Sequence, residues 1–300
     1  MSGSVRIMSG RGLRIIALMG LALVCMALAA LPAAAQGFSV GNPAQEFQLC
    51  PGESFTGSIP VINPSDQPKS LKVYAGDWVR VPGQSSDYAL EEEPGKEPRS
   101  LIPWMTFSPE RMTLEPGESR EVTFEVNVPD DWTLAGSYWG VIFIEGIPTE
   151  AEGVVPPTPE GVSVGITTVF RYAVQIFATM QDTEVRAAVF TTLNMEAAEN
   201  GFTATAVFQN NGNTMIRPKV WLELHDAAGE VVYTQEHSEQ TVLPESGRDF
   251  VFVLNDPSIP SGEYLVMIMG DYGVQSLIAA QGRVNLTITP PPESATTGGG

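Results

Sequence analysis

Few side chains in this chain could do covalent or metal chemistry, and they do not gather into a recognisable site. The only histidines are His225 and His237. A zinc site would need further ligands at diagnostic spacing, such as an HExxH motif or paired cysteines, and the sequence has neither. Cys50 follows a predicted strand in a turn, and no histidine lies in its half of the chain to act as its base. We therefore predict neither a metal site nor a catalytic nucleophile.

Carboxylates are abundant, and the most suggestive group is Asp130-Asp131 beside Trp132. Paired carboxylates serve glycoside hydrolysis, and spaced oxygen ligands bind calcium. With 35 acidic residues, however, adjacent pairs are expected by chance, and the spacing of a calcium loop is absent. Glycine-rich phosphate loops and the Gly-x-Ser-x-Gly elbow are also missing. The prediction is a protein that is not an enzyme and uses no cofactor. A glycan-active or metal-dependent hydrolase is the catalytic alternative.

The first 35 residues predict a secretory signal peptide. Three arginines come before or within the start of an apolar stretch, 13–31, and three alanines, 33–35, follow it. A retained anchor would need about 20 apolar residues without such a cleavage site. Lipid attachment at Cys25 is disfavoured because Val24 stands where a small residue is required. We expect a mature chain from Gln36, located in the periplasm or outside the cell, with no membrane span after cleavage.

Removal of that signal would leave a strongly acidic protein. It would have 13 basic and 35 acidic residues, a net charge of −22, because all three lost charges are arginines. Such a surface repels phosphate backbones, so nucleic acid is excluded as a partner. Only Cys50 would remain of the two cysteines, which rules out an intramolecular disulfide. The fold must then be stabilised by its hydrophobic core.

One short motif occurs twice and introduces the elements of the fold. Residues 49–54 read Leu-Cys-Pro-Gly-Glu-Ser and residues 114–119 read Leu-Glu-Pro-Gly-Glu-Ser. Proline presets the first central residue of a turn, and glycine accepts the left-handed angle of the second. After each copy, apolar residues recur at every second position, which is typical of a strand with one buried face. The motif therefore predicts two turns that lead into two strands.

The whole chain predicts an all-β protein with two immunoglobulin-like β-sandwich domains, 36–180 and 181–289, and a disordered tail, 290–300. Seven strand candidates in the first domain have the spacing of such a sandwich; they are 45–49, 54–63, 69–81, 104–107, 120–128, 136–146 and 164–180. The loops 82–99 and 148–161 are expected to be exposed. Tyr138 and Tyr264 occupy matching places in the two halves and suggest tyrosine corners.

The first domain resembles the immunoglobulin-like periplasmic chaperones of pilus assembly. The resemblance is carried by Trp104-Met105, Ser108-Pro109, 114–119, 122–128, 138–145 and the long strand 164–180. The same domain is similar to the first domain of the surface proteins that interact with WxL proteins, through Val61 to Pro68 and Tyr74-Ala75. Resemblance to that second family implies binding to peptidoglycan or to surface proteins, although its membrane helix and basic tail are missing here.

Resemblance to the pilus chaperones implies a specific partner site. In that family a basic pair from the first and last strands anchors the carboxylate of a subunit, and the last strand completes the subunit's sheet. Here residues 38–49 contain no lysine or arginine, and the last strand has only Arg171. The alternating apolar residues are kept, so the proposed partner-binding residues are Val164, Ile166, Phe170 and Arg171. The same alternation also fits a strand's core face.

These observations predict an exported, non-catalytic protein that captures another exported envelope protein, such as a pilin-like subunit, through a sheet edge. It would act as a chaperone or assembly factor. The alternative is a structural or adhesive surface protein that binds peptidoglycan or other envelope glycans.

Overall fold

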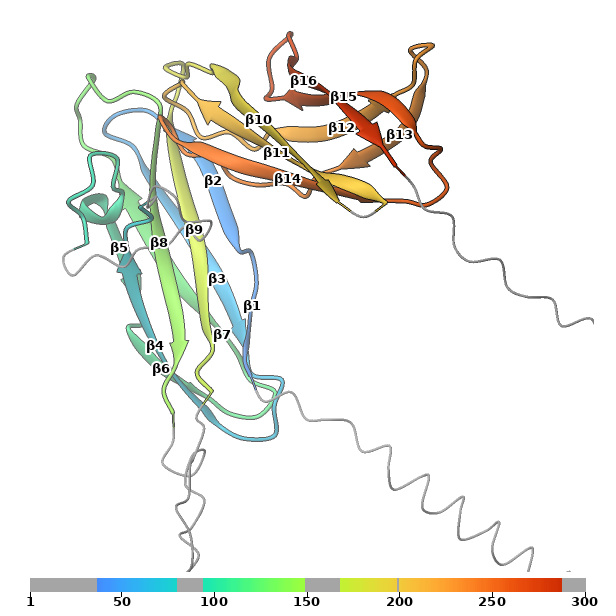
Figure 1. The fold of residues 1–300 in the computed structure, drawn as a ribbon. Coiled ribbons are helices and arrows are strands. Elements are labelled where there is room, and N and C mark those ends of the chain that lie inside the picture. Colours follow the sequence, from blue (N-terminus) through green and yellow to red (C-terminus); the bar gives the residue numbers. More distant parts are fainter. Residues whose placement is uncertain (1–36, 80–93, 149–167, 199, 288–300) are drawn as a thin grey trace, which may run out of the picture.

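The computed structural model describes residues 37–79, 94–148, 168–198 and 200–287, and these residues form an almost entirely β-structured protein (Figure 1). The predicted signal peptide and tail and most of the two predicted loops lie outside the described residues. In the described part, no helix is long and apolar enough to cross a membrane. The all-β prediction is confirmed, and the sheets form two sandwiches.

The first sandwich has the strand arrangement of an immunoglobulin domain. One sheet has the order β1 (Ser39–Val40), β3 (Ser54–Ile62), β7 (Ser119–Asn127) and β5 (Met105–Ser108). The other has the order β2 (Ala44–Leu49), β9 (Arg171–Met180), β8 (Ser137–Gly146), β4 (Lys69–Gly76) and β6 (Arg111–Leu114). These are the counterparts of strands A, B, E and D in one sheet and of G, F and C in the other.

The chain changes sheets between β1 and β2. Residues of β1 pair antiparallel with β3, and the amide of Gly41 donates to the carbonyl of Pro60 over 2.9 Å. After Asn42, which has a positive φ of 50°, the chain turns at Pro43 and continues as β2, which pairs parallel with β9. The first strand region therefore contributes to both layers.

The repeated motif folds into the same turn twice. Gly52 and Gly117 have φ of 81° and 73°, the conformation that favours glycine. In each copy the glutamate at the fifth motif position closes the turn: Glu53 accepts a hydrogen bond from the Cys50 amide, and Glu118 accepts one from the Glu115 amide, both over 2.8 Å. The prediction of two turns is therefore confirmed.

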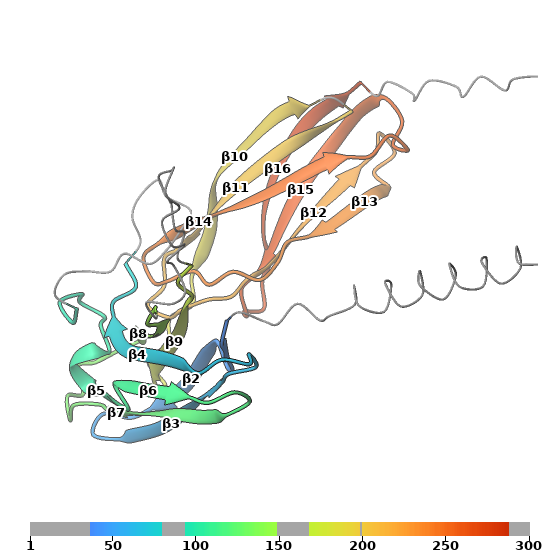
Figure 2. The ribbon, with the colours of Figure 1, turned by 90° about the horizontal axis from the view of Figure 1, so that it is seen from below.

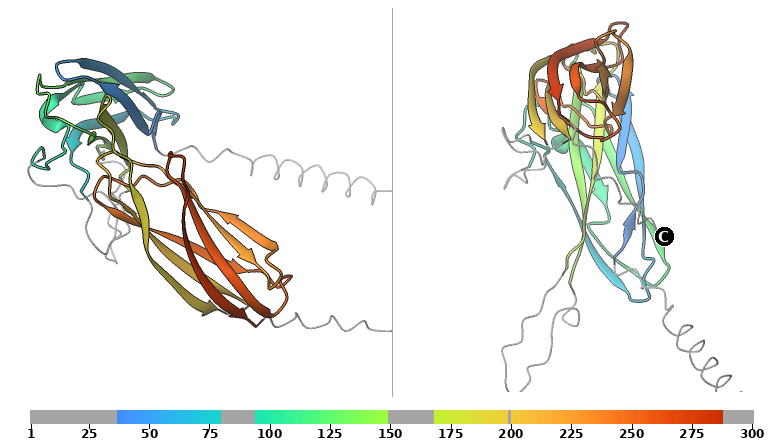
Figure 3. Two further views of the ribbon diagram at one scale, coloured as in Figure 1. Left: turned by 90° about the horizontal axis from the view of Figure 1, so that it is seen from above. Right: turned by 45° about the vertical axis from the view of Figure 1, so that its right-hand side comes forward.

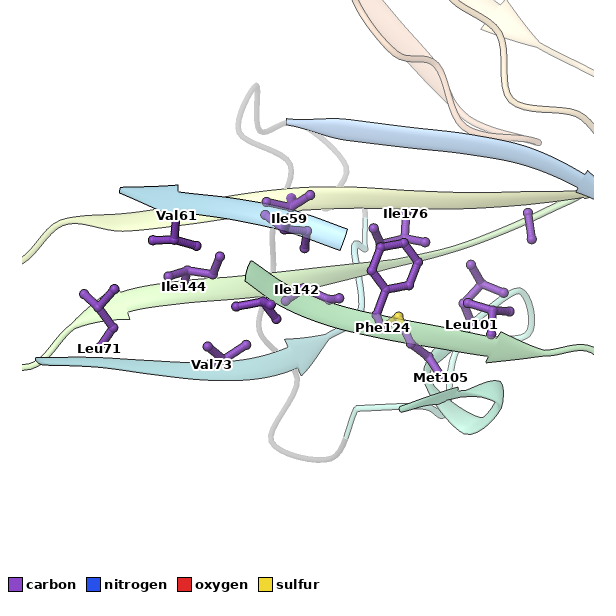
Figure 4. Packing of buried hydrophobic residues seen from close by; sticks show 14 of the residues in the cluster. Ile59, Val61, Leu71, Val73, Leu101, Met105, Phe124, Ile142, Ile144 and Ile176 are labelled. Atoms are coloured by element: carbon purple, nitrogen blue, oxygen red, sulfur yellow. The ribbon is translucent and has the colours of Figure 1, made fainter. Parts of the chain in front are cut away.

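Alternate residues of the two sheets build the core of the first sandwich (Figure 4). Phe124 of β7 lies between the layers, close to Ile142 and Ile176 of the opposite sheet in the view of Figure 4. Its ring takes the space above Gly57, where an added Cβ would lie 2.3 Å from the ring. Burial of such side chains is the main favourable contribution to folding, and Gly57 is the small residue that makes room for the largest of them.

The second sandwich is built from two further sheets. One has the order β10 (Ala188–Ala198), β11 (Gly201–Asn210) and β14 (Gly247–Asn255). The other has the order β13 (Val231–Glu236), β12 (Lys219–His225), β15 (Gly262–Asp271) and β16 (Ile278–Leu286). Phenylalanines 202, 208, 250 and 252 are fully buried between them.

The two predicted tyrosine corners have different outcomes. The hydroxyl of Tyr264 donates to the carbonyl of Pro260 over 2.8 Å, which is the bond that defines the motif. Tyr138 instead packs against the ring of Trp104, with 4.7 Å between centroids, and lies below the guanidinium of Arg99. Tyr138 is therefore held by ring contacts, and the matching sequence position does not give a matching bond.

The sandwiches meet at one end and extend in different directions (Figures 2 and 3). Trp78, Trp139 and Phe177 on the outer face of the first sandwich pack against Met215 and Leu243 of the second. The two tryptophans therefore fill the junction and not the core of either sandwich. Trp132, by contrast, is 75% exposed.

Backbone hydrogen bonds join the two sandwiches at the same place. The amide of Ser137 donates to the carbonyl of Asn213 over 2.9 Å, and the amide of Met215 donates to the Ser137 hydroxyl oxygen over 3.0 Å. Asn213 ends the asparagine-rich turn 210–213 that follows β11. The turn therefore also carries the contact between the two halves.

Candidate functional site

The first half of β9 offers main-chain groups at an open sheet edge. The amide of Gly146 donates to the carbonyl of Phe170, so even-numbered residues of β9 bond to β8. The amide of Gln175 donates to the carbonyl of Pro43, so odd-numbered residues point toward β2. In an antiparallel ladder this alternation continues along the strand. The amide and carbonyl groups of Arg171 and Ala173 therefore point to the side away from β8.

That side of the strand lacks a partner strand in the described residues. Strand β2 pairs with β9 only from Gln175 to Met180. Pro43 has no amide hydrogen, so it cannot donate to the carbonyl of Ala173 and extend the ladder. Before Pro43 the chain has already crossed to β3. Among the described strands, none therefore covers the edge from Val169 to Val174, an arrangement suited to pairing with another chain.

Apolar side chains continue along the same strand from the core into solvent. Val174 and Ile176 are buried in the core of the first sandwich. Tyr172 and Phe170 have the same parity, but they are 36% and 42% exposed. The ring of Tyr172 packs edge-on against the buried Phe38. The alternating apolar residues therefore face the core at the end of the strand and face solvent at its beginning. Both interpretations of the alternation, a core face and a surface for a partner, apply to different parts of the same strand.

Arg171 lies on the opposite face of this strand from Phe170. Its guanidinium is 3.3 Å from the hydroxyl of Tyr74 and 3.9 Å from a carboxylate oxygen of Glu145, and it lies above the ring of Phe143. The sequence placed Phe170 and Arg171 in one site, whereas the structure puts their side chains on two faces. Val164 and Ile166 lie outside the described residues, and their roles remain predictions.

Glu145 is the centre of the ionic network that holds Arg171. Burial raises the pKa of Glu145, but hydrogen bonds from the Tyr74 hydroxyl at 2.6 Å and from Lys72 at 2.9 Å outweigh it and hold this pKa below its ordinary value. Burial and the hydrogen bond to Glu145 raise the pKa of Tyr74. The arginine of the proposed site is therefore already engaged with neighbours of its own domain.

A cation missed by the sequence reasoning lies at the junction. Arg217, from the segment before β12, forms an ion pair with Glu46 of β2 and lies 3.6 Å from Glu239. Its guanidinium covers the ring of Phe177 at 5.6 Å, and burial lowers its pKa. Glu46 is thus a carboxylate that the first strand region, which has no lysine or arginine at residues 38–49, presents to the junction. No local motif marks Arg217, because its partners are distant in the sequence.

The two histidines contact different groups of the second sandwich. His225 contacts Glu223 at 3.0 Å, and His237 packs edge-on against Phe250 and Phe252. In the parts of the chain that the structure describes, no group of three metal-ligating side chains occurs.

The comparisons with known proteins return structures only. No protein-family model matches the sequence, and no curated protein matches it. The solved structures that match include the class 5 fimbriae chaperone CfaA, with 15% identity, coverage of 85% of this chain and 100% of that chain, and a TM-score of 0.40. They also include the E. coli chaperone DraB, with 16% identity, coverage of 83% and 98%, and a TM-score of 0.38. At TM-scores this low, the likeness carries no argument about function.

Proposed function

We propose that this chain is an exported, non-catalytic protein that captures another envelope protein by adding the open edge of β9 to the partner's sheet. It would act in the periplasm as a chaperone or assembly factor for a pilin-like subunit. The observation that carries the proposal is the edge formed by the start of β9, Arg171 to Val174, and the two residues before it. No described strand pairs with this edge, which ends where Pro43 stops the β2 ladder.

Main-chain pairing and side-chain pockets have separate roles in such a complex. Backbone bonds from Arg171 and Ala173 would supply affinity, and pockets for alternate side chains would supply selectivity. Phe170 and Tyr172 offer the side chains for such pockets, because they are large, apolar and already partly exposed. The predicted signal peptide supports the location, and the predicted stripe at Val164 and Ile166 would lengthen the same edge.

The first experiment is an affinity purification of residues 36 to 300 from an envelope extract of the source cell, with mass spectrometry of the bound proteins. Recovery of one small β-rich exported protein in stoichiometric amount is expected. Phe170→Asp should greatly reduce its recovery, because a charge would enter an apolar pocket. Ile62→Asp is the matched control, since Ile62 is equally exposed, at 42%, but lies on β3 in the other sheet. Equal loss in both variants would contradict edge capture.

Amide hydrogen exchange tests the pairing directly. In the complex the amides of Arg171 and Ala173 should exchange more slowly than in the free protein. The amides of Tyr172 and Val174 already bond to β8 and should change little. Protection of all four amides to the same extent would indicate general stabilisation, and protection of none would reject the edge. Sedimentation with purified peptidoglycan, unaffected by Phe170→Asp, would instead support the surface-protein alternative.

A further inference from the structure

A groove of about 470 Å³ opens on the second sandwich. Its apolar lining comes from Trp221, Val220 and Pro218 at the start of β12. Thr234 and Glu236 of β13 form one wall. Asp271 of β15 also lines the groove and lies opposite Lys219 in the neighbouring strand. Its volume is in the range of sites for small ligands or a few side chains, and is too small for a folded domain.

Trp221 is held in a fixed position at the groove. Its indole N–H donates to an oxygen of Glu223 over 2.9 Å, and the other oxygen of Glu223 contacts His225 at 3.0 Å. Across the sheet, Trp221 lies opposite Glu236 on one side and Met269 on the other. An aromatic ring that is already ordered loses little conformational entropy on binding, which is why such rings serve as anchors in interfaces.

Half-buried apolar side chains extend the surface from Trp221 along β15. Met269, Met267 and Leu265 follow at alternate positions, all on the outer face of the sheet. Methionine is adaptable and is common on surfaces that accept flexible partners. Beside the groove there is therefore an apolar floor that runs along one strand.

Carboxylates outnumber cations around this floor. Glu236, Glu239 and Asp271 line the groove together with Lys219 and the imidazole of His237. Glu239 lies 3.6 Å from Arg217, but within the described part of the chain Glu236 forms no ion pair. An ammonium or guanidinium group would meet both a free carboxylate and the face of an indole, and each of these attracts cations. A neutral saccharide could donate hydroxyl hydrogen bonds to these carboxylates, but it would gain no attraction between opposite charges.

We propose that the groove beside Trp221 binds a lysine- or arginine-bearing segment of a protein partner, with Trp221 as the aromatic anchor and Glu236 as the carboxylate that the cation contacts. This contact is separate from the edge of β9, and it does not depend on the function proposed for that edge.

The test uses the mature chain and a short fluorescein-labelled peptide of alternating lysine and glycine with one central leucine. Fluorescence anisotropy should show saturable binding that weakens with salt. We expect Trp221→Ala to weaken binding about tenfold or more, and Glu236→Gln to weaken it about threefold. Glu125→Gln is the matched control, because Glu125 is an exposed strand carboxylate of the first sandwich, and it should bind as the unchanged protein does.

Several outcomes would overturn the proposal. The absence of saturable binding would do so, as would equal binding by Trp221→Ala, Glu236→Gln and the unchanged protein, which would mean that only the overall negative charge attracts the peptide. Displacement of the peptide by chitotriose would assign the groove to a saccharide. Because Glu236 is exposed, its replacement keeps the test valid even if the tryptophan variant folds poorly.

Discussion

Replacement of Gly136 by alanine should loosen the junction between the two sandwiches. Gly136 has a φ of 74°, and an added Cβ would lie 2.1 Å from the carbonyl oxygen of Asn213. That oxygen belongs to the main chain, so it cannot turn aside as a flexible side chain could. It also accepts the hydrogen bond from the Ser137 amide over 2.9 Å. The methyl group can be accommodated only if the Asn213 turn moves away from the first sandwich.

The expected cost has two parts. A residue with a Cβ in the left-handed conformation costs about 1–2 kcal/mol, and loss of the Ser137 hydrogen bond costs about 0.5–1.5 kcal/mol. The two parts sum to about 1.5–3.5 kcal/mol, but only the lost hydrogen bond, about 0.5–1.5 kcal/mol, acts on the contact between the sandwiches. Each 1.4 kcal/mol changes an equilibrium about tenfold, so the population with an opened junction should rise by a factor of roughly 2 to 12.

Gly117→Ala is the matched control. Gly117 has nearly the same φ, 73°, but no atom lies within 4 Å of an added Cβ. This variant carries the backbone cost alone, about 1–2 kcal/mol, and it leaves the junction unchanged. The difference between the two variants therefore isolates the contact with Asn213.

Small-angle X-ray scattering and acrylamide quenching of tryptophan fluorescence are suitable assays. The Gly136 variant should have a larger radius of gyration and greater quenching, because Trp78 and Trp139 are buried at the junction. The Gly117 variant should match the unchanged protein in both. Identical scattering and quenching for all three proteins would refute the argument that this glycine maintains the junction.

Three further predictions concern stability. Because the pKa of Glu145 lies below its ordinary value, the stability that it contributes is present above about pH 4.3 and is lost as the pH falls through its folded pKa. In Glu145→Gln, the free energy of unfolding measured in urea should therefore fall less steeply as the pH is lowered, and an unchanged dependence on pH would count against this argument. Tyr264→Phe should cost about 0.5–1.5 kcal/mol through the lost corner bond, while Tyr138→Phe should cost almost nothing; equal effects would contradict the different outcomes of the two corners. Phe124→Ala should cost about 3–5 kcal/mol in urea unfolding, and a loss below about 1 kcal/mol would mean that the site collapses around the cavity.

Local patterns were sufficient for most of the first sandwich. Proline-glycine turns and period-two alternation depend on neighbouring residues, so the predicted strands 54–63, 120–128 and 136–146 agree closely with β3, β7 and β8. The short strands β1 and β6 were missed because two to four residues carry too little periodicity to stand out. The predicted strand 69–81 was too long, since β4 ends at Gly76.

The candidate site depends on contacts between residues that are far apart in the sequence. The alternation around Phe170 was readable, but where β2 stops covering β9 depends on the path of the chain at Pro43. Because Phe170 and Arg171 are neighbours in an extended strand, their side chains could have been predicted to lie on opposite faces. The prediction nevertheless placed both in one site, because the family resemblance treats the strand as one site. Arg217 and the junction tryptophans needed the second sandwich in place, and no spacing rule predicts that packing.

The uncovered half of β9 also has a consequence for how the protein behaves in concentrated solution. An open edge can pair with the same edge of another copy, so it is a route to aggregation. Within the described residues the route is limited by length, because β2 covers β9 from Gln175 onward, and it is limited further by repulsion between copies that each carry a large negative charge. Repulsion of this kind weakens as salt is added. Storage at low ionic strength should therefore keep the purified protein monodisperse, while concentrated salt brings the copies close enough for their edges to meet.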